Sequence, residues 1–424
     1  MTEILESDEW KQATEYTITD NDIDRARLLI GVDVANKHRE YVQTATYDSI
    51  RNFTVGAGND NPLHCDPHYA RRTRWGDVIA PGMMAGIINK PMLGDPMPED
   101  IKIRTKSLFK GVHVFVSGSE WTWHRPIYPA DTIYSFSGHD TLEVKQSEFA
   151  GRSVIRVNRH VNINQRAEVV AVYRVLMVLT ERGTARKKGK YAEIKPATYT
   201  DEEIAKIDEI YAAEEVRGAT PRYWEDVRVG ETMGLMAKGP LTVTDVMCFH
   251  AGGYGFFPYA PAVGRLAYLN RKRIPAFYIK NEQGVPDVAQ RLHWDPVWAR
   301  AIGNPMAYDY GVMRENYLYH FLTDWCGDDG VVVKLHDEVR KFSYMGDTQI
   351  ISGEVTDKRQ ADGRMLADVK LRMLNQRDEE TVTATATIAL PSRSGTMAAG
   401  APAPFELEQR AQSLMARHWQ LGGS

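Results

Sequence analysis

The sequence contains few cysteines and no long hydrophobic run. Its three cysteines, Cys65, Cys248 and Cys326, are widely separated and odd in number among 424 residues. This pattern fits neither a disulfide framework nor the closely spaced ligands of a zinc site, so we expect reduced thiols and no bound metal. The longest apolar runs, such as Val169–Leu179, are well short of the roughly 20 residues that a membrane-spanning helix needs.

The sequence also lacks an excess of charge of one sign. The formal net charge is −4, with 25% charged residues. Such a balance creates no basic field that would attract nucleic acid or an anionic membrane. The acidic N-terminus, Met1–Glu9, lacks the basic and apolar regions of a signal peptide. We therefore expect a cytoplasmic protein whose partner is a small molecule, not nucleic acid or a membrane, and we leave homodimerisation open.

What the sequence does contain is an internal repeat. A chain of 424 residues exceeds an ordinary domain of roughly 100–200 residues. The pattern H-x-D-P-x-x-A-R occurs at His64–Arg71 and again at His293–Arg300. A second set of matches follows in the same order, because Tyr128 with Asp131-Thr132 is repeated as Tyr344 with Asp347-Thr348. We infer that the chain carries one structural unit twice.

Each half ends in apolar stretches rich in β-branched residues, which predict antiparallel strands. They are Val154–Ile163 and Val169–Leu179 in the first half, and Met365–Leu374 and Thr381–Leu390 in the second. Each half also contains one strongly apolar helix candidate, Ala80–Ile88 and Gly311–Trp325, the latter with Gly327 as a stop. Because a helix with a broad apolar surface must be covered, we predict the α+β class, with two antiparallel sheets each wrapped around a central helix.

Composition predicts the boundaries between these units. We place an N-terminal domain at residues 1–183, a linker at 184–222, a C-terminal domain at 223–392 and a flexible tail with a helical pattern at 393–424. The linker begins with the basic stretch Arg182–Lys190 and continues into an amphipathic helix over Thr200–Glu215, capped by Thr200 or Asp201.

Several motifs together resemble a known family, the MaoC-like (R)-specific enoyl-thioester hydratases and dehydratases. The family signature G-D-x-N-P-[aliphatic]-H is matched by Gly58–His64, and Tyr223–Glu231 resembles the segment that opens these domains. Tyr128–Thr132 and Tyr344–Thr348 resemble their shared turn. The resemblance covers the chain from about Tyr16 to Leu390 and implies a fused double hot-dog fold.

By this resemblance, the chain is expected to add water to, or remove it from, a 2-enoyl or 3-hydroxyacyl thioester. Coenzyme A is expected as part of the substrate, with no other cofactor. The sequence leaves three alternatives open: a hot-dog thioesterase, an isomerase or cyclase of an unsaturated natural-product intermediate, and a non-catalytic acyl-binding subunit.

The resemblance assigns general acid-base catalysis to the Asp and His of the signature. His64 matches the histidine, but Asn59 stands where the family has its aspartate. Asp60 could supply the carboxylate instead, His64 could act with Asn59 positioning the water, or the first half could be a binding domain. Charge that develops on the thioester oxygen requires backbone N–H donors, and Gly82 lies where such a donor is expected.

The second half does not repeat the signature, because Val288 stands five residues before His293. His293 with Asp309 or His250, and Gly311 as the backbone donor, are the second-half candidates. Asp66 and Asp295 each precede a proline, so we interpret both as helix N-caps, and Asp131 and Asp347 as turn braces.

Two groups of residues are candidates for substrate binding. Arg71 and Arg74 could contact phosphates of coenzyme A, although a solvated basic face is the commoner explanation. Aromatic residues gather in and beside an insertion of the second half and could form an acyl pocket or a packed loop core. They include Tyr254, Phe257, Tyr278 and Trp294.

Overall fold

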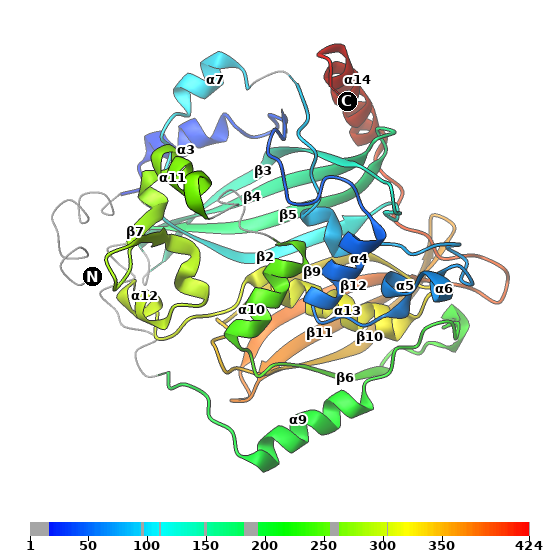
Figure 1. Ribbon diagram of the computed structural model, residues 1–424. Coiled ribbons are helices and arrows are strands. Elements are labelled where there is room, and N and C mark those ends of the chain that lie inside the picture. Colours follow the sequence, from blue (N-terminus) through cyan, green and yellow to red (C-terminus); the bar gives the residue numbers. More distant parts are fainter. Residues whose placement is uncertain are drawn as a thin grey trace.

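The computed structural model describes residues 17–94, 97–109, 112–147, 151–181, 194–254, 263–302 and 304–423 (Figure 1). The predicted basic stretch Arg182–Lys190, the acidic N-terminus Met1–Glu9 and Phe257 lie outside these residues. No helix in the described ranges has both the length and the apolar character needed to cross a membrane.

The first half is built from four long strands and several short helices. β4 (Gly151–Asn164) and β5 (Val169–Thr180) contain the two predicted strands of this half. The other strands are β1 (Val34–Ala35), β2 (His113–Trp123) and β3 (Ile133–Ser147). The helices are α3 (Asp20–Arg27), α4 (Tyr47–Gly56), α5 (Pro62–Cys65), α6 (Pro67–Ala70), the 3₁₀ turn η1 (Gly82–Gly86) and α7 (Glu99–Arg104).

The second half repeats this plan with an inserted segment. Its strands are β6 (Thr232–Lys238), β9 (Val331–Val339), β10 (Gln349–Ala361), β11 (Arg364–Asn375) and β12 (Glu380–Leu390), and the last two contain the predicted strands. The helices are η2 (Trp224–Asp226), α10 (Val243–Phe249), η3 (His250–Tyr254), α12 (Pro296–Ala301) and α13 (Gly311–Cys326). The insertion adds α11 (Gly264–Arg273), η4 (Pro275–Phe277), β7 (Tyr278–Lys280), β8 (Pro286–Val288) and η5 (Ala289–His293).

The two halves share one continuous sheet. Ten strands follow the order β1-β3-β4-β5-β2-β9-β12-β11-β10-β6. β2 pairs antiparallel with β9 at the seam, where Trp121 lies opposite Leu335. The predicted double hot-dog class is confirmed, and its two sheets are joined edge to edge so that neither half presents an unpaired strand at the seam.

The turn before the long strands is braced identically in both halves. Asp131 accepts a hydrogen bond from Gln165 Nε2 at 3.0 Å, and Asp347 accepts one from Gln376 Nε2 at 2.7 Å. Each glutamine in turn accepts from the backbone N–H of the residue after its aspartate. These bonds confirm that the aspartates brace turns, and they are the structural counterpart of the repeated motif.

The central helices of the two halves differ in length. α13 has 16 residues and ends at Gly327, whose φ of +70° matches the predicted stop. The predicted first-half helix is reduced to the five-residue turn η1. Asn162 Nδ2 donates to the Ala85 carbonyl at 2.8 Å and so occupies an acceptor that a continuing helix would use. The first half is therefore left with more room beside its sheet.

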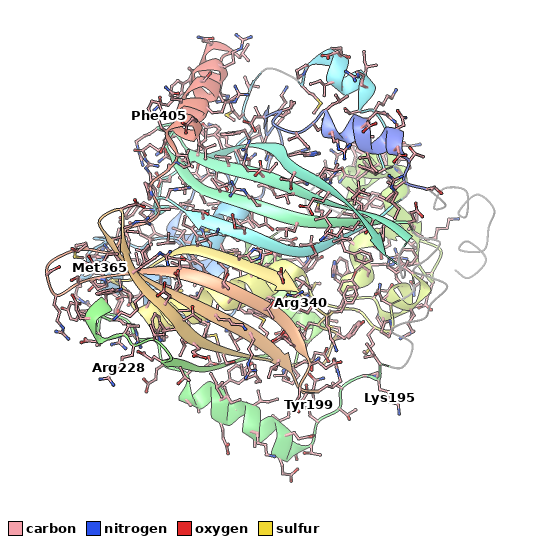
Figure 2. The ribbon with its side chains drawn as sticks, turned by 180° about the vertical axis from the view of Figure 1, so that it is seen from behind. Lys195, Tyr199, Arg228, Arg340, Met365 and Phe405 are labelled. Atoms are coloured by element: carbon pink, nitrogen blue, oxygen red, sulfur yellow. The ribbon has the colours of Figure 1, made fainter. Side chains whose placement is uncertain are left out.

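The segments outside the two halves pack against them. α9 (Asp201–Ala213) is capped by Thr200 through the predicted N-terminal motif. α14 (Phe405–Gln420) buries Ala411, Leu414 and Met415 against first-half strands. This packing corrects the expectation of a loosely attached tail, because an apolar face at helical spacing gains stability when it is removed from water. Figure 2 shows α14 and α9 beside opposite ends of the sheet. The domain boundaries remain predictions.

Candidate active site

His64 lies on the short helix α5, at the end of the signature loop. Its side chain is 3% exposed, and Nδ1 lies 2.7 Å from the carbonyl oxygen of Ile79. A carbonyl oxygen only accepts, so Nδ1 carries the proton and Nε2 keeps a lone pair. Nε2 is buried without a hydrogen-bond partner among the described residues. Burial lowers the pKa of His64 to about 4, so the ring is neutral at neutral pH and Nε2 is free to accept a proton.

The two residues considered for the family's carboxylate position point in different directions. Asn59 is buried, and its Oδ1 accepts a hydrogen bond from the Asn61 N–H at 2.9 Å. The side chain of Asp60 is 87% exposed, and its Oδ1 lies 3.7 Å from His320 Nε2 on α13. The nearby His320 imidazole lowers the pKa of Asp60. The loop therefore holds Asn59 inside with His64 and directs Asp60 toward the second half, and the three interpretations of this position remain predictions.

His64 lines a cavity of about 240 Å³ formed by both halves. Gly82 and Trp123 contribute from the first half, and Tyr319, Thr323 and Cys326 contribute from α13. None of the described residues that line this cavity is acidic. The cavity is therefore an apolar space with a few polar groups and no carboxylate of its own.

Gly82 lies against Trp123 of β2 at the wall of this cavity. A Cβ at this position would lie 2.6 Å from Trp123 Nε1, so a larger residue does not fit without movement. Trp123 Nε1–H is buried and has no acceptor among the described residues. Burial raises the pKa of Tyr319, and a hydrogen bond with the Gly82 backbone opposes that rise. A backbone amide, an indole N–H and a phenol thus lie together at one wall.

The two arginine candidates have separate environments. Arg74 lines the cavity, where Nη1 donates to the Ala398 carbonyl at 2.9 Å and the guanidinium stacks on Trp75. Its Nε also lies 3.8 Å from Asp329 Oδ1. Arg71 is exposed at the end of α6, away from the lining residues. Residues 398–400 of the C-terminal segment complete the cavity wall beside Arg74.

His293 has the matching position in the second half but a different environment. Its Nδ1 lies 2.9 Å from the Tyr308 carbonyl, and burial lowers its pKa to about 4. The ring of Tyr310 stacks on the imidazole with centroids 3.8 Å apart. The Tyr310 hydroxyl lies 3.1 Å from His250 Nε2 and accepts from Gln290 Nε2 at 2.8 Å. His293 and His250 are therefore joined through one tyrosine.

The remaining second-half candidates are placed around the start of α13. Asp309 is buried and pairs with Arg314 Nε at 2.8 Å. Burial raises the pKa of Asp309 to about 6, although Arg314 opposes the rise. Gly311 opens α13, and a Cβ there would meet no atom within 4 Å. The predicted N-caps are confirmed, because Asp66 and Asp295 each accept two backbone N–H groups of the helix that follows.

Two of the aromatic candidates, Tyr254 and Trp294, lie near His250. The Tyr254 ring packs 5.1 Å from that of Tyr310, and the Trp294 ring lies 6.1 Å from that of His250. Tyr278 is on β7 with its hydroxyl buried. None of these three described residues lines the cavity of His64. Their arrangement fits the packed loop core, and a role in substrate binding remains a prediction.

A larger open groove of about 900 Å³ lies between the linker and the second half. Lys195, Tyr199 and Arg340 are at its walls, as labelled in Figure 2. None of the predicted site residues lines it. We therefore locate the candidate active site at the smaller cavity, where the signature loop is.

Several residues of the site were not predicted from the sequence. Trp123 and Tyr319 lie far from the signature in the chain, and only the packing of α13 across the seam brings Tyr319 to Gly82. A buried acid pair also lies at this seam: Ser119 Oγ donates to Asp337 Oδ1 at 2.6 Å, and Trp121 Nε1 donates to Glu315 Oε2 at 2.9 Å. No local motif indicates such contacts.

The chain was compared with known protein families and structures. Residues 29–173 match the model of the FAS1-like dehydratase domain region, about a third of the chain. A structure described as a MaoC-like dehydratase aligns with a TM-score of 0.56 and 13% identity over 86% of this chain and 99% of that chain. A MaoC domain dehydratase structure from Chloroflexus aurantiacus aligns with a TM-score of 0.47 and 12% identity over 86% and 96%. A double hot-dog protein of Mycobacterium tuberculosis gives 0.45 and 11% over 86% and 97%.

The family-model match and the first of these structures confirm the predicted resemblance to MaoC-like dehydratases and its fold. Of the three structures, the first exceeds a TM-score of 0.5, and at 13% identity it shows the fold alone. The matched region contains the signature loop, η1 and most of the long first-half strands. No significant match was found among the curated proteins.

Proposed function

We propose that this chain is a hydro-lyase that adds water to, or removes it from, a 2-enoyl or 3-hydroxyacyl thioester, with coenzyme A as the expected carrier. The observation that carries the proposal is the neutral, buried His64, which lines a cavity and whose Nε2 has no hydrogen-bond partner among the described residues. The dehydratase model that matches this half of the chain, and the resemblance of the signature, support the reaction class.

In the hydration direction, His64 Nε2 takes a proton from water as its oxygen bonds to the β-carbon. The electron pair of the double bond moves toward the thioester carbonyl and forms an enolate. The protonated imidazole then returns the proton to the α-carbon, so the sum is one water added and no charge left behind. Asn59, held by its bond to Asn61, has an amide that can orient the water but cannot take its proton.

The negative charge on the enolate oxygen requires hydrogen-bond donors that are already in place. We assign this role to Gly82 N–H and Trp123 Nε1–H, because both residues line the cavity and the indole N–H has no acceptor among the described residues. The Tyr319 phenol, which now bonds to the Gly82 backbone, would give way to the substrate oxygen or add its own O–H. Because η1 has only five residues, we assign this stabilisation to the individual N–H groups.

The size and charge of the cavity narrow the proposal. Its volume of about 240 Å³ is below the roughly 300–1,000 Å³ of ordinary ligand pockets and favours a short acyl group. Arg74 at its wall is suited to an electron-rich part of the substrate. A thioesterase that activates water with a carboxylate is less well supported, because none of the described lining residues is acidic.

The proposal is tested by incubating the protein with 2-enoyl-CoA thioesters of 4, 6, 8 and 12 carbons and following the loss of enoyl absorbance. We expect turnover that is fastest on the short substrates and a loss of about 10²–10⁴-fold in His64→Ala. His68→Ala is the matched control, because His68 is an exposed histidine four residues away.

A parallel assay for free thiol distinguishes the alternatives. Release of coenzyme A without hydration would show a thioesterase. Absence of any turnover by the parent, together with unchanged acyl-CoA binding in His64→Ala, would contradict the proposal and favour a non-catalytic subunit.

A further inference from the structure

A group of charged side chains connects the second half to the signature loop of the first. Lys238, the last residue of β6, donates from Nζ to the carbonyl oxygen of Gly58 at 2.7 Å. Gly58 has a φ of +67° and directly precedes Asn59. A second-half strand therefore holds the backbone from which the signature residues project.

Lys238 is itself fixed by two further segments. Its Nζ lies 3.0 Å from His320 Nδ1 on α13. An ammonium group only donates, so Nδ1 accepts and the His320 proton lies on Nε2. That atom is 3.0 Å from Asp324 Oδ2 and 3.7 Å from Asp60 Oδ1. The imidazole, only 3% exposed, thus faces one carboxylate from each half of the chain.

Three carboxylates near Lys238 favour its charged form. Burial lowers the pKa of Lys238, while the carboxylates of Glu214, Asp324 and Asp60 act in the opposite direction. Glu214 follows α9 of the linker and accepts from the Ala237 N–H at 2.7 Å. One half-buried cation therefore lies among groups of the linker, α13 and the signature loop, and its removal would leave these acids without their shared counter-charge.

We propose that Lys238, held by His320 and Asp324, is a positioning residue for the signature loop. It fixes the Gly58 carbonyl, and through that backbone it sets the places of Asn59 and His64. The second half, which lacks the signature, would thereby contribute to catalysis in the first. The catalytic part of this inference rests on the proposed function, since a displacement of about 1 Å at a reacting group can cost about 100-fold in rate.

The test replaces Lys238 by methionine in the full chain, which keeps most of the volume and removes the donor. Backbone hydrogen exchange of residues 59–64 should become about tenfold faster. On a thioester that the parent turns over, kcat should fall about tenfold while KM changes less than about twofold, because a general loss of structure would not separate the two constants. Lys334→Met is the matched control, since Lys334 is a 45% exposed lysine paired with Glu120 at 2.7 Å.

Unchanged loop exchange in Lys238→Met would overturn the inference. If the parent turns over no thioester, the proposed function fails, and the exchange measurement still decides the positioning role. If Lys238→Met does not fold, His320→Asn and His320→Leu decide instead. Asparagine can still accept from Lys238 and leucine cannot, so loop exchange should be faster in the leucine variant, and equal exchange in both would refute the role.

Discussion

The two halves hold a histidine in the same way and surround it differently. His64 Nδ1 lies 2.7 Å from the Ile79 carbonyl, and His293 Nδ1 lies 2.9 Å from the Tyr308 carbonyl. His64 faces a cavity, and its Nε2 has no hydrogen-bond partner in the part of the chain that the structure describes, whereas His293 is covered by the stacked ring of Tyr310. Both halves thus hold the imidazole Nδ1 beside a backbone carbonyl. They differ in what lies next to the ring, which is a cavity in the first half and a tyrosine ring in the second.

The central helices show the same contrast. The second half keeps the long helix α13, which fills the space beside its own sheet and also supplies Tyr319, Thr323 and Cys326 to the first-half cavity. The first half has the single turn η1 and therefore room for a ligand. We infer that the two halves have divided their tasks, with chemistry in the first and support from the second.

The sharpest test of this division is the same substitution in each half. His64→Ala should lower kcat by about 10²–10⁴-fold, because the proton acceptor is lost. His293→Ala should lower it by less than about tenfold, through packing around Tyr310. Both are measured by hydration of a short 2-enoyl-CoA, and a larger loss in His293→Ala would move the active site to the second half.

Two glycines, one in each half, extend the comparison to the proposed backbone donors. Gly82→Ala should reduce kcat by about 10²-fold, because the added Cβ lies 2.6 Å from Trp123 Nε1 and displaces the donors. Gly311→Ala should leave kcat near that of the parent, because nothing lies within 4 Å of its Cβ position. Equal kinetic effects in the two variants, at equal thermal stability, would argue against Gly82 as the donor.

A carboxylate at position 59, where the family signature has aspartate, should increase the activity of the first-half site. In Asn59→Asp the new charge favours the protonated imidazole and so raises the pKa of His64 from its lowered value of about 4. We expect kcat at pH 7 to rise about tenfold and the acidic limb of the pH–rate profile to move to higher pH. Asn59→Ala, which loses the bond to Asn61, should instead lower kcat. A fall in both variants would favour a role for the amide itself.

The smallest expected effect is a change in thermal stability caused by two acids at the seam between the halves. Glu315 and Asp337 are both buried, and burial raises the pKa of each carboxyl. The unfolded chain releases these protons at lower pH than the folded one, so stability falls as pH rises from the ordinary carboxyl range through the raised values. Glu315→Gln removes one such titration and retains an acceptor for Trp121.

We therefore expect Glu315→Gln to melt roughly 2–4 °C higher than the parent at pH 8 and at nearly the same temperature at pH 5. Thermal unfolding at the two pH values checks this. Glu354→Gln, at an exposed strand position, is the control and should show no pH-dependent difference. A gain of the same size at both pH values would show that repacking, not titration, is responsible.

Local patterns predicted those parts of the molecule that depend on neighbouring residues. The β-branched stretches became β4, β5, β11 and β12, and Thr200 capped α9. The repeated Asp131 and Asp347 brace the same turn. In contrast, η1 is shorter than the pattern predicts and ends where Asn162 donates to the Ala85 carbonyl, and α14 is packed against strands that precede it by more than 200 residues.

The sequence by itself determined the duplication, through its repeated motif, and the strands and N-caps, through periodicity and short-range hydrogen bonding. The resemblance to a known family indicated that His64 lies in a signature loop. Only the tertiary structure decided which side chains surround that histidine. Trp123 and Tyr319 line the cavity of His64 from a distant strand and helix, and Lys238 of β6 contacts the signature loop at the Gly58 carbonyl. Contacts between distant segments depend on how sheets and helices pack, and no short stretch of sequence carries that information.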